Sequence, residues 1–176
     1  MLAARVLVVL LLGAAPLQAQ TPPDTAANAP AEWLIGMSLG FPGVRSQIVP
    51  ELFTFGLNFT QVCSGRIGGD IAFGTMPWLF ANGIIAFGFR GDVTVPLVRP
   101  HFILLPSAGV SAIGAFTPGG GGGGGGVAGL NAGIAAVVHS HGVGLRTGVT
   151  VHKFFGLDTP VWLLEVGFVS IGIDPP

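Results

Sequence analysis

The sequence predicts an all-β fold, an eight-stranded antiparallel up-and-down transmembrane β-barrel. Eight segments alternate between apolar and small or polar residues with the period of two that a β-strand requires. Only 9% of the 176 residues are charged, against about 25% in an ordinary soluble domain. The few charges in these segments share a face with small residues, opposite the large apolar side chains. Together these observations favour a barrel whose apolar face meets lipid.

The N-terminus has the pattern of a secretory signal peptide. Arg5 precedes an apolar run from Val6 to Leu12, and small residues then lead to Ala19. The alternative is a membrane anchor, but the run is shorter than the about 20 apolar residues that a spanning helix needs. We therefore expect residues 1–19 to be a cleaved signal that directs export.

The rest of the chain divides into three parts. Residues 20–30, QTPPDTAANAP, are polar and Pro-rich and predict a linker. Residues 31–173 carry the alternating segments and predict the barrel, and residues 174–176 form a C-terminal tail. The single cysteine, Cys63, cannot form an internal disulfide and is interpreted as incidental.

The stretch LFTFGLNFT shows the alternation most clearly. Phe53, Phe55, Leu57 and Phe59 fall on one side of an extended chain, with Thr, Gly and Asn on the other. Turn residues separate the segments, as expected for an all-β chain. The eight predicted strands are residues 32–41, 52–60, 66–74, 87–97, 101–111, 129–138, 143–152 and 162–168.

A bundle of transmembrane helices does not fit the sequence. The apolar stretch 78–89 is interrupted by Asn82 and Gly83, and the stretch 102–116 by Pro106 and glycines. Neither provides the about 20 uninterrupted apolar residues of a spanning helix. The chain also has a net charge of −1 and no basic patch, which argues against nucleic acid as a partner.

The distribution of charge indicates which face looks inward. Charges of both signs lie on the small-residue face, which suits a narrow, crowded interior better than a solvated surface. A charge on the lipid face at mid-membrane would cost about 2–4 kcal/mol. Lys153 is the exception on the apolar face, and it falls at the end of its strand, where the cost is about 0–1 kcal/mol. The predicted interior charge network is Arg66, Asp70, Arg90, Asp92, Arg146 and Glu165.

The connections also alternate in length. Three are short, at residues 62–65, 97–100 and 139–142, and the others are mostly longer. Outer-membrane barrels have short turns on the periplasmic side and longer loops outside. A closed barrel also removes the unpaired strand edges that lipid cannot tolerate.

With its signal sequence, eight alternating strands and short turns such as LVRPHF, the chain resembles the small eight-stranded outer-membrane β-barrel proteins, the OmpA-like and OmpX-like group. The resemblance covers residues 31–173 and rests on pattern, not on a sharp motif. Members usually end in an aromatic residue that the assembly machinery reads, whereas this chain ends in IGIDPP. Pro106 falls inside a strand, and the alternation slips after Phe168, so a bulge is expected at Pro106 and another at Val169 or Ser170.

Hairpin geometry predicts pairs within the charge network. Asp70 is expected near Arg90, Arg66 near Asp92, and Glu165 within reach of Arg146 or His152 on the neighbouring strand. We interpret these pairs as structural, because removing one partner of a buried pair costs about 3–5 kcal/mol. An ion path through the lumen is the alternative interpretation.

Three other features have ordinary explanations. HSHG, residues 139–142, has too few ligands for zinc and no acidic residue to complete a nucleophilic site, so it predicts a turn. The glycine-rich residues 118–126 have no side chains to carry chemistry and predict a flexible surface loop. Aromatic residues near strand ends could form interfacial girdles. These aromatic residues are Trp33, Trp78, Phe80 and Trp162.

These observations predict a protein of the cell outer membrane with a structural or surface-interaction role. Its partners would be outer-membrane lipid and the outer-membrane assembly machinery, and the sequence does not identify a surface partner. We expect no catalytic residue, cofactor or metal. Eight strands give an interior that side chains can fill, so a general diffusion pore is not expected. A small channel is the first alternative, and a lipid-modifying enzyme of the outer membrane is the second.

Overall fold

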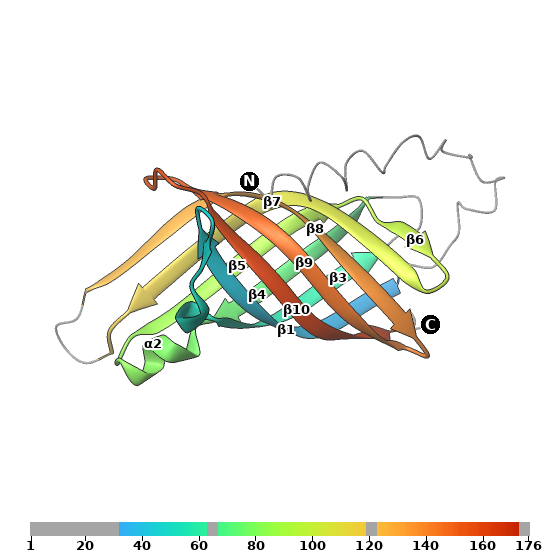
Figure 1. Ribbon diagram of the computed structural model, residues 1–176, viewed down its shortest axis with the longest axis horizontal. Coiled ribbons are helices and arrows are strands. Elements are labelled where there is room, and N and C mark those ends of the chain that lie inside the picture. The colour runs from blue at the N-terminus through green and yellow to red at the C-terminus, as the bar shows by residue number, and fades with distance from the viewer. Residues whose placement is uncertain (1–31, 63–66, 119–122, 173–176) are drawn as a thin grey trace.

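A computed structural model describes residues 32–62, 67–118 and 123–172, which form one closed antiparallel β-barrel (Figure 1). The wall follows the order β1, β3, β4, β5, β7, β8, β9 and β10, and β10 pairs with β1, which closes the barrel. The strands are β1 (Glu32–Val44), β2 (Gln47–Ile48), β3 (Thr54–Val62), β4 (Gly68–Thr75), β5 (Ile85–Thr94), β6 (Leu97–Arg99), β7 (Phe102–Phe116), β8 (Gly124–Ser140), β9 (Val143–Phe154) and β10 (Val161–Gly172). A 3-10 turn, η2 (Pro50–Leu52), and a short helix, α2 (Pro77–Ala81), lie in the connections.

The short strand β6 continues β5, so the wall has the eight strands that the sequence predicts. Both segments follow the same register on β7, with Thr94 opposite Ser107 and Leu97 opposite Leu104. Only Val95 and Pro96 interrupt the ladder between them. β2 is a two-residue extension that folds back on the end of β1.

The predicted orientation of the two faces is confirmed. Phe55, Leu57 and Phe59 are 41%, 42% and 36% exposed, whereas Asn58 and Thr60 on the opposite face are buried. The same alternation runs through β9, where Leu145 points outward and Arg146 points inward. The outer surface is therefore a largely apolar belt, and the buried polar side chains face the lumen.

The two ends of the barrel differ in their connections. The short-turn end carries the β6–β7 and β8–β9 turns, the start of β1 and the end of β10 (right in Figure 1). The loop end carries α2, η2 and the connection that follows β9 (left in Figure 1). At the short-turn end, His141 and Gly142 have φ of 51° and 81°, which is the backbone of a two-residue type I′ hairpin turn. Of the HSHG motif, His141 and Gly142 form the expected turn, while His139 and Ser140 are the last two residues of β8.

Among the described residues, no helix is long and apolar enough to cross a membrane.

The two expected bulges are wrong. β7 pairs with β8 without interruption from Phe102 to Phe116, and β10 pairs with β1 without interruption through Val169 and Ser170. Pro106 is accommodated because its side of the strand faces the gap between β5 and β6, where its carbonyl accepts from the Val95 N–H at 3.1 Å. The polarity slip after Phe168 has another cause, since Val169 faces an apolar part of the lumen.

The predicted loop at the glycine-rich residues 118–126 is also partly wrong. Gly124, Gly125 and Gly126 belong to β8 and pair with Phe116, Ala115 and Gly114 of β7, so they are not part of a loop. Ladder hydrogen bonds come from the backbone, so a glycine can extend a strand whose partner continues. Residues 119–122 lie outside the described residues, as do the predicted signal peptide, the linker and Cys63.

Candidate functional site in the barrel lumen

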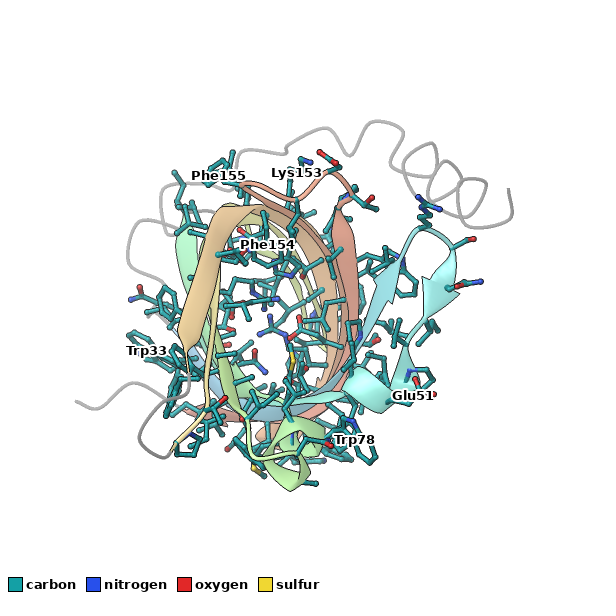
Figure 2. All side chains as sticks on the ribbon, turned by 90° about the vertical axis from the view of Figure 1, so that its left-hand side faces the viewer. Trp33, Glu51, Trp78, Lys153, Phe154 and Phe155 are labelled. Carbon is teal, nitrogen blue, oxygen red and sulfur yellow. The ribbon has the colours of Figure 1, made fainter. Side chains whose placement is uncertain are left out.

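The lumen consists of three layers along the barrel axis: an apolar plug, a charge network and an open cup. Each layer is built from inward-facing positions of the same strands. Figure 2 looks from the loop end into the barrel and shows nitrogen and oxygen atoms of side chains at its centre.

The apolar plug lies at the short-turn end. Its residues are almost inaccessible: Leu34, Ile103 and Val137 are 0% exposed and Leu105 is 1% exposed. Side chains from β1, β3, β7, β8 and β10 meet there. The plug comprises Leu34, Val62, Ile103, Leu105, Ala135, Val137 and Val169, with Val98 and Ile171 packed against it.

Arg90 is the centre of the charge network. Its Nη2 lies 3.0 Å from Asp70 Oδ2, and its Nη1 lies 2.7 Å from Glu165 Oε2. Nε lies 3.1 Å from Asp92 Oδ2, an ion pair without hydrogen-bond geometry. The guanidinium also donates to Thr150 Oγ1 at 3.1 Å. One cation therefore holds carboxylates from β4, β5 and β10 across the lumen.

Arg146 adds a second cross-link. Its Nη2 donates to Asp70 Oδ2 at 2.9 Å and its Nη1 to Asp70 Oδ1 at 3.1 Å, a bidentate pair between β9 and β4. Nη1 also donates to Thr60 Oγ1 at 2.7 Å, and the Thr60 hydroxyl donates to Asp70. Asp92 accepts from Asn131 Nδ2 at 2.8 Å. Buried charges in this layer thus have charged or hydrogen-bonding partners.

The predicted site residues are placed as follows. Asp70 pairs with Arg90, as the hairpin geometry suggested. Glu165 was expected within reach of Arg146 or His152 on the neighbouring strand; its ion pair is with Arg90 across the lumen, a partner that the sequence did not predict. The lumen is narrow enough for an arginine to span it, so partners on distant strands compete with neighbours. Arg66 lies outside the described residues, and its predicted pairing with Asp92 stays a prediction.

Sequence reasoning missed most of the plug and the uncharged partners of the network. The inward row of β7 includes Ile103 and Leu105, and the inward rows of β3 and β10 continue to Val62 after Thr60 and to Val169 after Glu165. The signal was present as apolar residues at the short-turn ends of inward-facing rows. Thr60, Thr150 and Asn131 carried no such signal, because many inward positions are small and polar.

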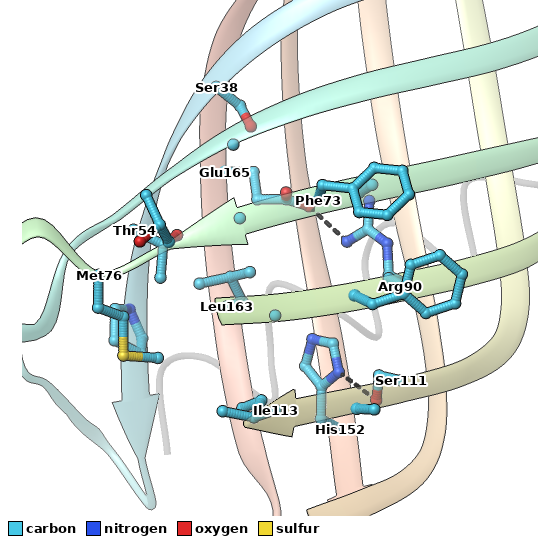
Figure 3. Close-up of a pocket in the computed structure, with 18 of the residues that line it drawn as sticks. Ser38, Thr54, Phe73, Met76, Arg90, Ser111, Ile113, His152, Leu163 and Glu165 are labelled. Atoms are coloured by element: carbon cyan, nitrogen blue, oxygen red, sulfur yellow. Dashed lines mark hydrogen bonds and ion pairs between the residues drawn. The ribbon is translucent and has the colours of Figure 1, made fainter. Parts of the chain in front are cut away.

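The cup occupies the loop end above the charge network. It is a cavity of about 120 Å³ (Figure 3). Arg90 and Glu165 lie at its base, His152 Nδ1 lies 3.0 Å from Ser111 Oγ, and Asn58 Nδ2 donates to Ser38 Oγ at 2.8 Å. Its width comes from inward glycines: a Cβ at Gly88 would have a nearest neighbour 3.9 Å away.

The aromatic residues named from the sequence lie at both ends of the barrel. Trp33 is at the short-turn end of β1, and Trp78 and Phe80 are on α2 at the loop end, all of them exposed. Trp162 packs over Gly43 and donates its indole N–H to the Arg45 carbonyl at 3.0 Å. Lys153, near the end of β9, donates to the carbonyl of Asp158 at 2.9 Å in the following loop.

Solved structures of other proteins have a similar architecture. A major outer membrane protein of Thermus thermophilus superimposes with a TM-score of 0.61 at 12% identity, covering 82% of this chain and 100% of that one. The N-terminal β-barrel domain of Pseudomonas aeruginosa OprF gives 0.58 at 10% identity, covering 79% and 97%. The attachment invasion locus protein Ail of Yersinia pestis gives 0.53 at 13% identity, covering 81% and 97%.

The chain has the fold of the small eight-stranded outer-membrane β-barrels. The predicted resemblance to the OmpA-like and OmpX-like group is confirmed at the level of fold. No protein-family model matches the chain, and the search of curated proteins found no relative.

Proposed function

We propose that the protein resides in the outer membrane, has a structural or surface-interaction role there, and does not act as a general diffusion pore. The exposed apolar belt supports the location, because a surface of Phe, Leu, Val and Ile around a closed barrel is stable in lipid and not in water. Lipid is then the partner of the outer wall.

Export and assembly follow from the same proposal. The predicted signal peptide, residues 1–19, would direct the chain across the inner membrane, and the assembly machinery would insert the barrel. Barrels of this kind place short turns toward the periplasm. The loop end, with α2 and the cup, would then face outward, and the plug would lie toward the periplasm.

The observation that carries the closed-lumen proposal is the plug. Ile103, Leu105 and Val137 fill the short-turn end with apolar side chains, and the Arg90 and Arg146 ion pairs bridge the layer next to it. An ion entering from the cup would have to leave water and pass an apolar layer. This disfavours the small-channel alternative and leaves the outer surface and its loops as the places where function would reside.

A lipid-modifying activity has no comparable support. His139 and His141 lie at the short-turn end, at the opposite end of the barrel from the cup. His141 is also one of the two residues of the hairpin turn. Among the described residues, no three His, Cys, Asp or Glu side chains are placed to hold a metal ion.

Liposome swelling tests the proposal. Purified protein reconstituted into liposomes should give sugar uptake no faster than protein-free liposomes, with a 16-stranded porin as the positive control. Recording in a planar bilayer should show no stable conductance steps. Rapid swelling, or regular steps that depend on the protein, would contradict a closed lumen and favour the channel.

A further inference from the structure

We propose that the cup at the loop end binds the head and proximal chain of a primary alkylammonium, a single-chain amphipath with three N–H donors. This goes beyond the structural or surface-interaction role, because that role needs no ligand in the lumen. The inference rests on the hydrogen-bonding chemistry of the cup's base, on its apolar walls and on the space between them.

The base of the cup offers acceptors. Glu165 uses Oε2 for its pair with Arg90, and no hydrogen bond between described residues uses its Oε1. Asn58 is 2% exposed and its Oδ1 has no hydrogen-bond partner within the described chain. Leaving such a buried acceptor unpaired is costly, which favours a donor in the cup.

His152 supplies the third polar group. Its Nδ1 faces Ser111 Oγ, and its other ring nitrogen lies on the side away from Ser111 (Figure 3). When Nδ1 donates to Ser111, Nε2 is an acceptor. Arg90 also lies at the base, but its Nη1 donates to Thr150 and Glu165, its Nη2 donates to Asp70, and its Nε faces Asp92. The acceptors left at the base are therefore Glu165 Oε1 and, in that tautomer, His152 Nε2, with Asn58 Oδ1 buried in the lining. A primary ammonium has three donors and no acceptor, and its charge complements a network in which, among the described residues, three carboxylates face two guanidiniums. A carboxylate or phosphate would face these same acceptors unfavourably.

The walls suit a hydrocarbon chain. Ile113, Phe154, Val161 and Leu163 line the cup, and Met76 lies beside Thr54 in its lining (Figure 3). Ligand sites in proteins are commonly of this kind, mostly apolar with a few polar groups that fix orientation. Among the described residues, the plug closes the far side, so a ligand would enter from the loop end.

The inward glycines provide a way to block the cup without altering the ion pairs. A Cβ at Gly88 meets nothing closer than the Ala112 carbonyl at 3.9 Å, so Gly88→Leu should fold with its side chain inside the cup. Gly91 lies on the same strand, has the opposite parity and faces outward. Its Cβ would meet the Phe89 ring at 3.5 Å, an ordinary contact, so Gly91→Leu is the matched control.

The test is a titration of isotope-labelled barrel with octylammonium, monitored by the backbone amide NMR signals of Gly74, Ser111 and His152. We expect saturable shifts at these amides, lost in Gly88→Leu and kept in Gly91→Leu. Octanoate should give no saturable shift. Octyltrimethylammonium keeps the charge but has no N–H, so it should bind at least about tenfold more weakly.

Three results would overturn the proposal. They are the absence of saturable shifts with octylammonium, equal binding of the three amphipaths, and unchanged binding in Gly88→Leu. Should Gly88→Leu fail to fold, the comparison of the three amphipaths on the natural protein decides the matter alone. Liposome swelling tests the closed lumen and does not depend on ligand binding. An open pore would therefore contradict the proposed function, and an empty cup would contradict only the ligand proposal.

Discussion

The two ends of the lumen use the same strands and the same inward parity, but they are filled with different side chains. On β3 the inward residue is Val62 at the short-turn end and Gly56 toward the loop end. On β1, Leu34 of the plug is followed along the strand by Ser38 of the cup. Side-chain size along the inward row thus decides where a barrel is closed and where it is hollow, and alternation alone does not report it.

Breaking the charge network, which lies between the plug and the cup, should have the largest effect on stability, because it leaves buried charges without partners. Arg90→Ala would leave Asp70, Asp92 and Glu165 without their shared cation, and we expect a loss of at least about 3–5 kcal/mol in the free energy of unfolding. Denaturant titration of the refolded barrel measures it. Arg99→Ala, at an exposed arginine of β6, is the control.

The pairing of Asp70 with Arg90 can be isolated by a double-mutant cycle. Asp70→Ala and Arg90→Ala should each destabilise the barrel, and the double variant should cost less than their sum by about 0.5–3 kcal/mol. Additive losses would show that the two side chains do not interact, despite their 3.0 Å separation.

The plug should behave as a packed protein core. Leu105→Ala removes a side chain that is 1% exposed, and we expect a loss of about 2–5 kcal/mol. Leu130→Ala, on the outer wall with 56% exposure, should cost less, because detergent or lipid fills the gap. Equal losses at the two positions would mean that the plug is not tightly packed.

Glycine substitutions sharpen the comparison at the smallest scale. A Cβ at Gly167, between Glu165 and the plug, would lie 2.1 Å from the Met37 carbonyl, so Gly167→Ala should cost about 1–3 kcal/mol. Gly88→Ala in the cup has open space and should change stability by no more than about 0.5 kcal/mol. Thermal or denaturant unfolding of both variants decides whether the loop end is as open as the geometry indicates.

The sequence was sufficient for the fold, because period-two alternation and the segregation of charge are properties of single strands. It predicted the ion pair between Asp70 and Arg90, because these residues lie on neighbouring strands two positions apart in register. It did not predict the ion pairs of Arg90 with Glu165 and of Arg146 with Asp70, because these pairs cross the lumen between strands that are not neighbours. Such pairs depend on barrel diameter and on arginine reach, which no local pattern contains.

The errors at Pro106, Val169 and Gly124 have a common origin. Each was interpreted from the residue type alone, and each outcome depended on what lay beside it in the sheet. Pro106 faces a gap in the neighbouring ladder, Val169 faces the plug, and Gly124 has a β7 partner. Knowledge of the neighbouring strand's register would have corrected all three.

Thiol accessibility tests most directly the claim that the lumen is open at one end and closed at the other. In a Cys63→Ala background, single cysteines at Gly88 in the cup and Val137 in the plug would be treated with a charged, water-soluble methanethiosulfonate. Gly88→Cys should react readily in the folded barrel, whereas Val137→Cys, at a position that is 0% exposed, should react only after unfolding. Rapid modification of Val137→Cys in the folded protein would contradict a closed plug.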